Sequence, residues 1–560
     1  MIDAVPPGLV LIAGGLALPW VGEGWRRALL LGLPAVVLAM VWQLGDGAAL
    51  ELAFLGYELT PVEGSRLGRL FATVFALMAF AGGLFALGRA CAAELAAALV
   101  YAGAAIGVAL AGDLLTVFVF WELMAIGSTL VIWSAGGEAA RRAGMRYVMI
   151  HLLGGVVLMA GIIGHVGETG SLAFHAMAAE GWPRWLILAG FLLNAGAPPL
   201  SAWIADAYPE TSPSGMVFLS AFTTKAAVLV LLRGFPGAEI LIYVGLYMMF
   251  YGIVYALLEN DMRRILAYSI VNQVGFMVAG IGIGTELALN GAAAHAFTHI
   301  IYKALLLMSA GAVLAMTGRR KCTDLGGLFQ SMPLTAACGI VGALSISSFP
   351  LTSGFISKSM ISEAASMEHL GLVWLLLTAA TAGVFLHAGI KFPWFVFFQK
   401  DSGLRPPDPP WTMRAAMLLL AFLCIALGVY PAPLYAILPH PVDYAPYTRV
   451  HVVLMLQLLL FAGLAFFVML PWMRRTLTIS LDWDWFYRVL GRRWALAAGR
   501  AITAADERVR GAVRLQLDAI IAEVFRHHGP HGALARGWPS GSMVLWVAIL
   551  LAAVLVFYYA

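Results

Sequence analysis

Charged residues and cysteines are scarce in this sequence. Charged side chains make up 11% of its 560 residues, whereas they make up about a quarter of a typical soluble domain. A soluble globule is therefore excluded. The cysteines are Cys91, Cys322, Cys338 and Cys424, and none of them forms a CxxC pair. We therefore expect neither an iron–sulfur cluster nor a disulfide framework, and we predict no bound cofactor and no metal.

Long apolar runs, in contrast, fill most of the chain. Hydrophobic residues make up 61% of the sequence, and its mean hydropathy is +0.88. Runs of about 20 residues, long enough to cross a bilayer, recur about sixteen times. We predict an all-α polytopic membrane protein, and we expect no cleavable signal peptide because residues 1–7 lack a basic region. The predicted spans lie near 6–22, 28–44, 66–88, 92–111, 113–135, 146–166, 184–204, 212–233, 238–258, 262–284, 290–316, 333–364, 371–398, 412–430, 449–470 and 542–559.

Two of these spans are interrupted by residues that break helices, in the segments 194–199 (NAGAPP) and 348–354 (SFPLTSG). A broken helix exposes backbone groups inside the membrane. Because this is tolerated only beside a polar cavity, such breaks mark ion sites in transporters. The predicted organisation is N-terminal helices in 1–91, five-helix units in 92–233 and 238–398 with the broken helix fourth in each, further helices in 412–470, a lateral segment in 474–541 and an anchoring helix in 542–560.

Basic residues mark one side of the predicted bundle. Threading the spans in order puts every basic cluster on the same side, which the positive-inside rule makes the cytoplasm. We therefore expect a multi-pass protein of the bacterial inner membrane with both termini outside. The clusters are Arg26 and Arg27, Arg89, Arg141 and Arg142, Arg263 and Arg264, Arg319 to Lys321, Lys400, and Arg474 and Arg475.

The segment 474–541 has a different composition, with eleven arginines, six carboxylates and no lysine. A basic amphipathic helix of this kind lies along a membrane surface or on partner subunits. We expect it on the cytoplasmic side. The apolar residues that recur along one helical face are Val509, Val513, Leu517, Ile521 and Phe525.

The predicted span 290–316 carries three ionisable residues in register. His295, His299 and Lys303 are spaced four residues apart, so they form one stripe along a helix. Ionisable groups at membrane depth are unfavourable and mark ion or proton routes. A single histidine here would indicate a hydrogen bond to a neighbouring helix, whereas three groups in register favour conduction.

Further ionisable residues lie inside other predicted spans. Glu122, Lys225 and Lys358 are surrounded by apolar sequence, and His151 and Lys391 lie in similar surroundings. The structural alternative for Glu122 and Lys225 is a buried ion pair. For Lys391 the alternative is a side chain that extends to the cytoplasmic interface, and for His151 it is a hydrogen bond that packs two helices.

Several stretches together resemble one family, the antiporter-like subunits shared by Mrp-type cation/proton antiporters, respiratory complex I and membrane-bound hydrogenases. They lie within about residues 60–400 and are FVFWELM, PPLSAWIADAYPETSPSG with AFTTKAAVLVLLR, ENDMRRILAYSIVNQVGF, HAFTHIIYKALLLMSAG and FPLTSGFISKSMI. Among the members, the D-type subunits of Mrp antiporters and their paralogues are the most similar. The resemblance implies two inverted five-helix repeats, each with a broken helix. It also implies a proton relay that consists of Glu122, Lys225, His295, His299, Lys303 and Lys358.

One position departs from the family pattern. Where the family usually has a lysine before the first break, this chain has Asn194, whose amide cannot titrate. We therefore expect Glu122 to keep its proton over much of the neutral range. We also expect Asn194 to hold water or a transient cation through its amide oxygen, and His151 to be a replacement titrating group. The C-terminal arm resembles the lateral arm of the largest antiporter-like subunit of complex I, which implies assembly into a larger complex.

The sequence thus predicts a proton-translocating subunit of a multisubunit Mrp-type monovalent cation/proton antiporter, a secondary transporter subunit rather than an enzyme. Its expected partners are other subunits and membrane lipid, with H⁺ and Na⁺ as the transported ions and no nucleic acid. Three alternatives stay open. They are a proton-pumping subunit driven by a redox module in partner subunits, the membrane subunit of an inorganic-carbon uptake system, and a structural membrane anchor.

Overall fold

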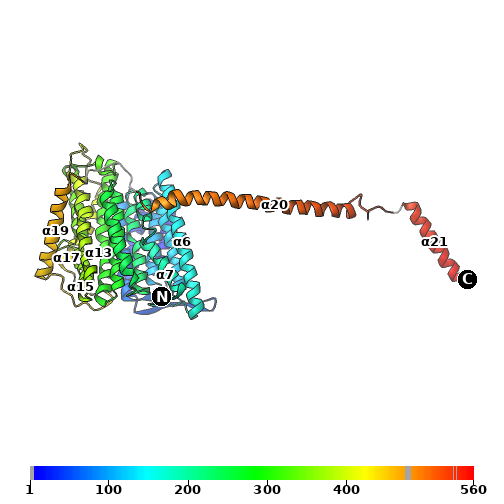
Figure 1. Ribbon diagram of the computed structural model, residues 1–560, viewed down its shortest axis with the longest axis horizontal. Coiled ribbons are helices and arrows are strands. Elements are labelled where there is room, and N and C mark those ends of the chain that lie inside the picture. The colour runs from blue at the N-terminus through cyan, green and yellow to red at the C-terminus, as the bar shows by residue number, and fades with distance from the viewer. Residues whose placement is uncertain (1–4, 473–480, 534, 538) are drawn as a thin grey trace. The chain divides into compact units, whose positions relative to one another are not determined.

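The computed structural model describes residues 5–472, 481–533, 535–537 and 539–560. It contains two compact units, one ending at Asp484 and one comprising Trp485–Ala560 (Figure 1).

The first unit is a helical bundle. Its helices are α1 (Pro7–Ala17), α2 (Glu23–Gln43), α3 (Arg66–Ala86), α4 (Ala92–Leu110), α5 (Leu114–Trp133), α6 (Gly137–Thr169), α7 (Gly181–Ala195), α8 (Trp203–Ala207), α9 (Gly215–Ala221), α10 (Thr223–Gly234), α11 (Ile240–Leu258), α12 (Met262–Ile283), α13 (Glu286–Thr317), α14 (Pro333–Ile346), α15 (Ser353–Met367), α16 (Gly371–Val384), α17 (Trp411–Val429), α18 (Ala432–Tyr435) and α19 (Arg449–Met469).

The helices confirm the all-α polytopic class. Within the described residues, thirteen helical stretches are long and apolar enough to cross a membrane, and shorter apolar helices lie at Pro7–Trp20 and Pro333–Ile346. Each predicted span coincides with one or two helices. Helices α7 and α14 are shorter than a full membrane span, because each of them ends at one of the predicted breaks.

Both predicted breaks are present. The helix α7 ends at Ala195, and the next residue, Gly196, has a φ of +83°. Glycine adopts this left-handed conformation without the Cβ clash that other residues meet, so it commonly ends helices. In the second break, α14 ends at Ile346 and α15 begins at Ser353. The backbone groups at these helix ends lack their normal partners inside the helix.

A β-hairpin precedes α3, in a region where the sequence predicts no regular structure. Strand β1 (Gly47–Phe54) pairs antiparallel with β2 (Tyr57–Gly64). The backbone of Thr60 in β2 donates a hydrogen bond to Asp113, the residue before α5. Nearby, Glu63 pairs with Arg233 of α10 at 2.5 Å. The hairpin therefore packs on the end of the bundle where α5 begins and α10 ends.

The second unit contains a long helix and a short apolar one. After the π-helical segment η8 (Phe486–Gly491), α20 runs from Arg492 to His528 and α21 from Ser540 to Tyr559. At 1.5 Å per residue, the 37 residues of α20 extend about 55 Å. The predicted apolar face is exposed, with Val509 and Phe525 both 62% accessible. This face is thus uncovered in the isolated chain.

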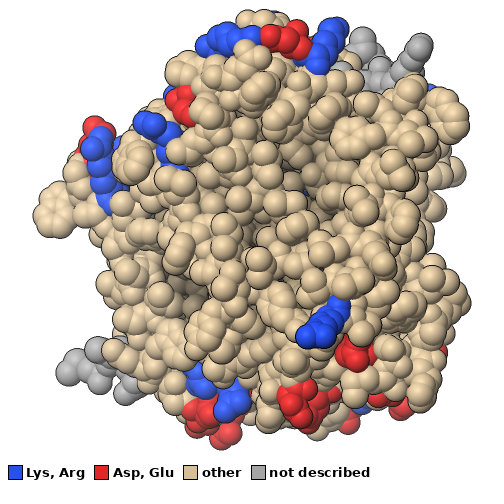
Figure 2. All heavy atoms as spheres, turned by 90° about the vertical axis from the view of Figure 1, so that its left-hand side faces the viewer, with Lys and Arg blue, Asp and Glu red and all other residues tan. Residues whose placement is uncertain are grey.

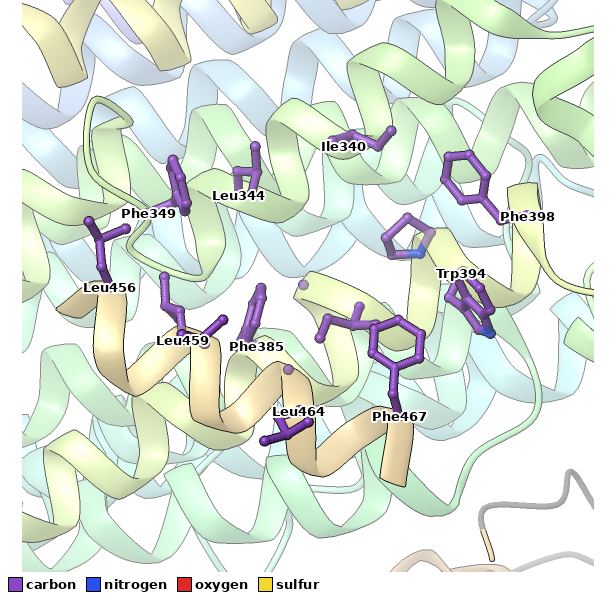
Figure 3. Close-up of a pocket in the computed structure, with 15 residues that line it drawn as sticks. Ile340, Leu344, Phe349, Phe385, Trp394, Phe398, Leu456, Leu459, Leu464 and Phe467 are labelled. Atoms are coloured by element: carbon purple, nitrogen blue, oxygen red, sulfur yellow. The ribbon is translucent and has the colours of Figure 1, made fainter. Parts of the chain in front are cut away.

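The first unit has an apolar flank. On the face in Figure 2, charged side chains gather at the upper and lower margins and the middle carries almost none. A hollow of about 760 Å³ lies between α14, α19 and the π-helical segments η6 (Phe385–Lys391) and η7 (Trp394–Phe398) that follow α16 (Figure 3). None of its lining residues is charged. This hollow is therefore separate from the ionisable residues described next.

Candidate functional site

The predicted stripe lies on one uninterrupted helix in the centre of the bundle. The side chain of Thr285 caps the start of α13 by accepting a hydrogen bond from the backbone of Ala288. About three to five turns further along, His295, His299 and Lys303 are completely buried. Because α13 packs against α10, α12, α14 and α15, groups on this helix can reach both predicted five-helix units.

His295 connects α13 to two neighbouring helices. Its Nδ1 lies 2.9 Å from the hydroxyl of Ser357 on α15, and its Nε2 lies 3.2 Å from the amide oxygen of Gln273 on α12. Tyr302 donates a hydrogen bond to the same amide oxygen at 2.9 Å. The imidazole therefore sits in a polar network that ends one residue before Lys358.

His299 has a different environment. Neither of its ring nitrogens has a hydrogen-bond partner among the described residues. Its ring lies 6.2 Å from that of His295 and meets Tyr302 edge to face at 5.3 Å. Buried polar groups are normally satisfied, so an unsatisfied one calls for an explanation. Both ring nitrogens of His299 thus lack the hydrogen bonds that a buried imidazole normally makes.

Three buried lysines hold neutral oxygen acceptors rather than carboxylates. Lys225 donates to the carbonyl of Ser220 at 2.6 Å and to Thr224, whereas Lys303 donates to Ser269 at 2.8 Å. Lys358 donates to the carbonyl of Ile346 at 2.6 Å. All three lysines are at most 1% accessible. None forms an ion pair among the described residues, so the alternative of a structural Glu122–Lys225 pair is wrong.

Interrupted helices provide two of these acceptors. Ile346 is the last residue of α14, so its carbonyl is one of those that the helix leaves free. Ser220 lies beside a third interruption, which the sequence does not predict, where Phe222 between α9 and α10 has φ −106° and ψ −68°. The broken helices thus turn backbone carbonyls into lysine sites, as discontinuous membrane helices do for ions.

Glu122 lies against α6. One of its carboxylate oxygens, Oε1, is buried without a hydrogen-bond partner among the described residues. A Cβ added to Gly155 would lie 2.0 Å from this oxygen. The glycine therefore leaves the space that the carboxylate occupies, and any side chain at position 155 would displace it.

Asn194 and His151 form a buried pair. The amide oxygen Oδ1 of Asn194 lies 2.8 Å from Nδ1 of His151, and both side chains are 1% accessible. This hydrogen bond joins α6 to α7, and the second ring nitrogen of His151, Nε2, has no partner among the described residues. The same hydrogen bond changes the expectation for Asn194, because the amide oxygen is engaged by a histidine.

Lys391 does not extend to the membrane interface. Its side chain is 4% accessible, and its Nζ donates to the carbonyls of Ala256, Leu257 and Glu259 at 3.0, 2.6 and 2.6 Å. The interfacial alternative is therefore wrong. These carbonyls lie at the C-terminal end of α11, where a positive charge interacts favourably with the helix dipole.

Some residues of the site were not predicted. Gln273 and Ser357, which hold His295, were missed, although Gln273 stands out as an amide in an apolar span. Glu94 was missed as well, and it is 2% accessible and accepts hydrogen bonds from Ser212 and Ser214. Glu94 lies near the start of a predicted span, so the sequence does not distinguish it from an ordinary carboxylate in the first turn of a helix. Among the described residues, no group of three or more His, Cys, Asp and Glu side chains could hold a metal ion.

Arginines from three places gather around the connection between α8 and α9. Arg146 pairs with Asp206 at 2.7 Å, and Arg320 pairs with Glu210 at 3.0 Å. Arg263 donates to the carbonyl of Thr211 at 2.6 Å. These contacts place the basic residues at the start of α6, the start of α12 and the end of α13 at one end of the bundle.

Comparison with known proteins identifies the family. Residues 111–385, which include all six predicted relay residues, match the model described as "NADH:quinone oxidoreductase/Mrp antiporter, TM". The chain is an antiporter-like membrane subunit. The antiporter-like subunit is 32% identical over 359 residues to a component of a probable K⁺/H⁺ antiporter of Rhizobium meliloti, which is 60% of this chain and 36% of that protein. The antiporter-like subunit thus spans well under half of this relative.

Solved structures share the fold of the antiporter-like subunit. A chain in the Mrp complex from Dietzia sp. DQ12-45-1b has a TM-score of 0.78 at 21% identity, covering 92% of this chain and 62% of its own length. A chain in the membrane-bound sulfane sulfur reductase, an archaeal respiratory membrane complex, has a TM-score of 0.72 at 24% identity and covers 99% of this chain and 100% of its own length.

Proposed function

We propose that the antiporter-like subunit translocates protons within a multisubunit Mrp-type antiporter that exchanges Na⁺ or another monovalent cation for H⁺. The path crosses two inverted five-helix units, in 92–233 and 238–398. Other membrane subunits complete the complex, and the basic arm in 474–541 docks on them. The bundle end that carries Arg146, Arg263 and Arg320 faces the cytoplasm. The proposed relay consists of Glu122, Lys225, His295, His299, Lys303 and Lys358.

The observation that carries this proposal is the set of three buried lysines without carboxylate partners. Within the described part of the chain, the hydrogen bonds of Lys225, Lys303 and Lys358 go to hydroxyls and carbonyls, and none goes to a carboxylate. A lysine in such a site gives up and regains its proton readily, because no fixed anion holds the charge. The histidines between them on α13 offer proton acceptors at neutral pH. In a purely structural anchor, ammonium groups without carboxylate partners at this depth would be unfavourable and would serve no function.

Purification of the intact complex tests this proposal. The complex is extracted from native membranes through a tag on this chain, its subunits are identified by mass spectrometry, and it is reconstituted into proteoliposomes. We expect partner subunits without redox centres and proton movement that is driven by a Na⁺ or K⁺ gradient. Redox proteins in the complex, together with the absence of cation-driven proton movement, would refute the antiporter assignment.

One observation favours a second candidate, a proton-pumping subunit of a redox-driven complex. The chain of the sulfane sulfur reductase complex corresponds to the antiporter-like subunit over the whole length of both chains, including the C-terminal arm. The Mrp-complex chain is longer and is covered over 62% of its length. In this second candidate the same relay moves the protons, and partner subunits supply the electron transfer.

A further inference from the structure

We propose that His151 carries protons between Glu122 and Lys225 in the first five-helix unit. This inference rests on the proposed function and assigns the missing step between its first two residues. Glu122 and Lys225 form neither an ion pair nor a direct hydrogen bond with each other, so a proton that passes between them needs a carrier in reach of both.

The pair with Asn194 prepares His151 for this role. An amide oxygen only accepts hydrogen bonds, so Nδ1 of His151 donates to it and the lone pair lies on Nε2. Nε2 is buried and has no hydrogen-bond partner among the described residues. The ring of Trp203 packs edge to face on the imidazole at 4.7 Å and helps to fix its orientation. His151 therefore presents a single free basic nitrogen.

Glu122 lies within one helical turn of this ring. Its Oε1 occupies the space beside Gly155, four residues after His151 on α6. Residues four apart on a helix share one face, with Cβ positions about 5–6 Å apart. The unpartnered carboxylate oxygen and the imidazole are thus neighbours on the inner face of α6.

Hydroxyl groups continue from His151 toward Lys225. The ring of Tyr147, one turn before His151, stacks at a tilt against the imidazole with centroids 4.0 Å apart. The Tyr147 hydroxyl donates to Ser128 at 2.9 Å and lies 3.4 Å from the hydroxyl of Thr223. The next residue, Thr224, accepts a hydrogen bond from Nζ of Lys225 at 3.0 Å. Tyr147, Thr223 and Thr224 therefore lead from the ring that stacks on the imidazole to the amine of Lys225.

The other charged groups nearby are already paired. The titratable and charged residues on the surrounding elements include Glu122 on α5, Arg146 and Tyr147 on α6, Asp206 on α8, Lys225 on α10, and the buried phenols of Tyr101 on α4 and Tyr208 just after α8. Arg146 and Asp206 form a bidentate ion pair with each other. Glu122 and Lys225 are therefore the groups with which the imidazole exchanges protons.

The step is a simple proton transfer. A proton leaves the carboxyl of Glu122 and binds Nε2, which makes an imidazolium and a carboxylate. The same proton then leaves Nε2 for the unprotonated amine of Lys225 by way of the hydroxyls, and the neutral ring is restored. The Nδ1 proton stays in its hydrogen bond with Asn194 throughout.

Substitution of His151 by glutamine tests the step in everted vesicles that contain the whole complex. Glutamine preserves the size of the side chain and its ability to bond Asn194, but it cannot titrate. We expect His151→Gln to lower the cation-driven proton exchange rate by about a hundredfold, the contribution of one general acid–base group, and to remove one limb of the pH profile. His165→Gln, on the same helix, is the matched control and keeps the wild-type rate. An assembled His151→Gln complex with a wild-type rate and pH profile would overturn the inference.

A parallel Glu122→Gln complex separates this inference from the proposed function. If Glu122→Gln loses exchange and His151→Gln keeps it, only the role of His151 is refuted. If Glu122→Gln keeps full exchange, the proposed relay fails. Should His151→Gln reduce assembly, the exchange variant His151→Asn with Asn194→His is used. It retains one imidazole and one amide across the same two helices, so we expect transport, and an assembled but inactive exchange variant would overturn the inference.

Discussion

Gly155 and Glu122 are in direct contact across the interface of α5 and α6. A Cβ at position 155 would lie 2.0 Å from Oε1 and 2.9 Å from the carboxylate carbon. The neighbouring Gly154 faces a different group, the end of the flexible Leu193 side chain, 3.1 Å from an added Cβ. Substituting each of the two glycines in turn therefore distinguishes the effect of moving the carboxylate from the effect of disturbing the packing of α6.

The first prediction follows from this difference. Gly155→Ala displaces the carboxylate of Glu122, so we expect proton exchange to fall at least about tenfold, since small misplacements of reacting groups have effects of this size or larger. Gly154→Ala requires only a small shift of Leu193 and keeps most of the activity. Both variants are compared by exchange rate per assembled complex in vesicles. Equal rates in the two variants would show that the position of Glu122 does not limit transport.

The second prediction concerns Asn194. An ammonium group at this position favours the ionised carboxylate of Glu122 and removes the hydrogen bond to His151. We therefore expect Asn194→Lys to shift the pH optimum of transport downward. The pH profile of exchange is measured for the variant and for Asn194→Gln, which keeps a neutral amide and a profile like that of the wild type. An unchanged profile in Asn194→Lys would show that Glu122 and position 194 are not coupled.

Much of the fold is predictable from the sequence, because a bilayer constrains it strongly. Each apolar run of sufficient length has to be helical in order to satisfy its own backbone, and Gly196 and the residues around Ser348 end helices for local reasons. The hairpin in 47–64 was missed because a search for apolar runs of about 20 residues does not detect strands of eight residues. A signal is present in the turn, where Leu55 and Gly56 both have positive φ, but leucine is an unusual residue at such a position.

The site was less predictable than the fold. The helical period places His295, His299 and Lys303 on one stripe, but it does not say which groups on other helices face them. Gln273 and Ser357 reach His295 only because α12, α13 and α15 cross at that height. The third interruption, at Phe222, likewise contains no glycine or proline from which it could be predicted. The partner of Asn194 depends on the packing of α6 on α7, which a single sequence does not specify.

The third prediction separates a structural lysine from the relay. Lys391 bonds three carbonyls at the end of α11, and hydrogen bonds to a charged group contribute about 1.5–3 kcal/mol each. We expect Lys391→Met to lower the free energy of unfolding of the solubilised complex by about 2 kcal/mol or more. The remaining folded complex should transport at a rate near that of the wild type. Lys400→Met, at an exposed position, is the control. A stable but inactive Lys391→Met complex would place this lysine in the proton path instead.

The fourth prediction concerns the basic arm. A chain that ends before Arg474 retains α19 but lacks α20, whose residues are all exposed in the isolated chain. We expect the truncated protein to insert into the membrane and to lose partner subunits during affinity purification. In the full chain, replacing Val513, Leu517 and Ile521 by serine should have the same effect, whereas Asp518→Ala should not. Unchanged yields of all partners from the truncated protein would assign the arm to lipid headgroups.

The most direct measurement is proton flux through the reconstituted complex with Glu122→Gln or Lys225→Met. The intact complex is placed in proteoliposomes with a pH-sensitive dye inside, and a monovalent cation gradient starts the exchange. Assembly is verified by subunit composition and size-exclusion profile. The relay predicts that both variants assemble like the wild type and lose nearly all cation-driven proton flux. Full flux in either assembled variant would contradict the relay, and loss of assembly without loss of flux per complex would show that these residues only hold the helices together.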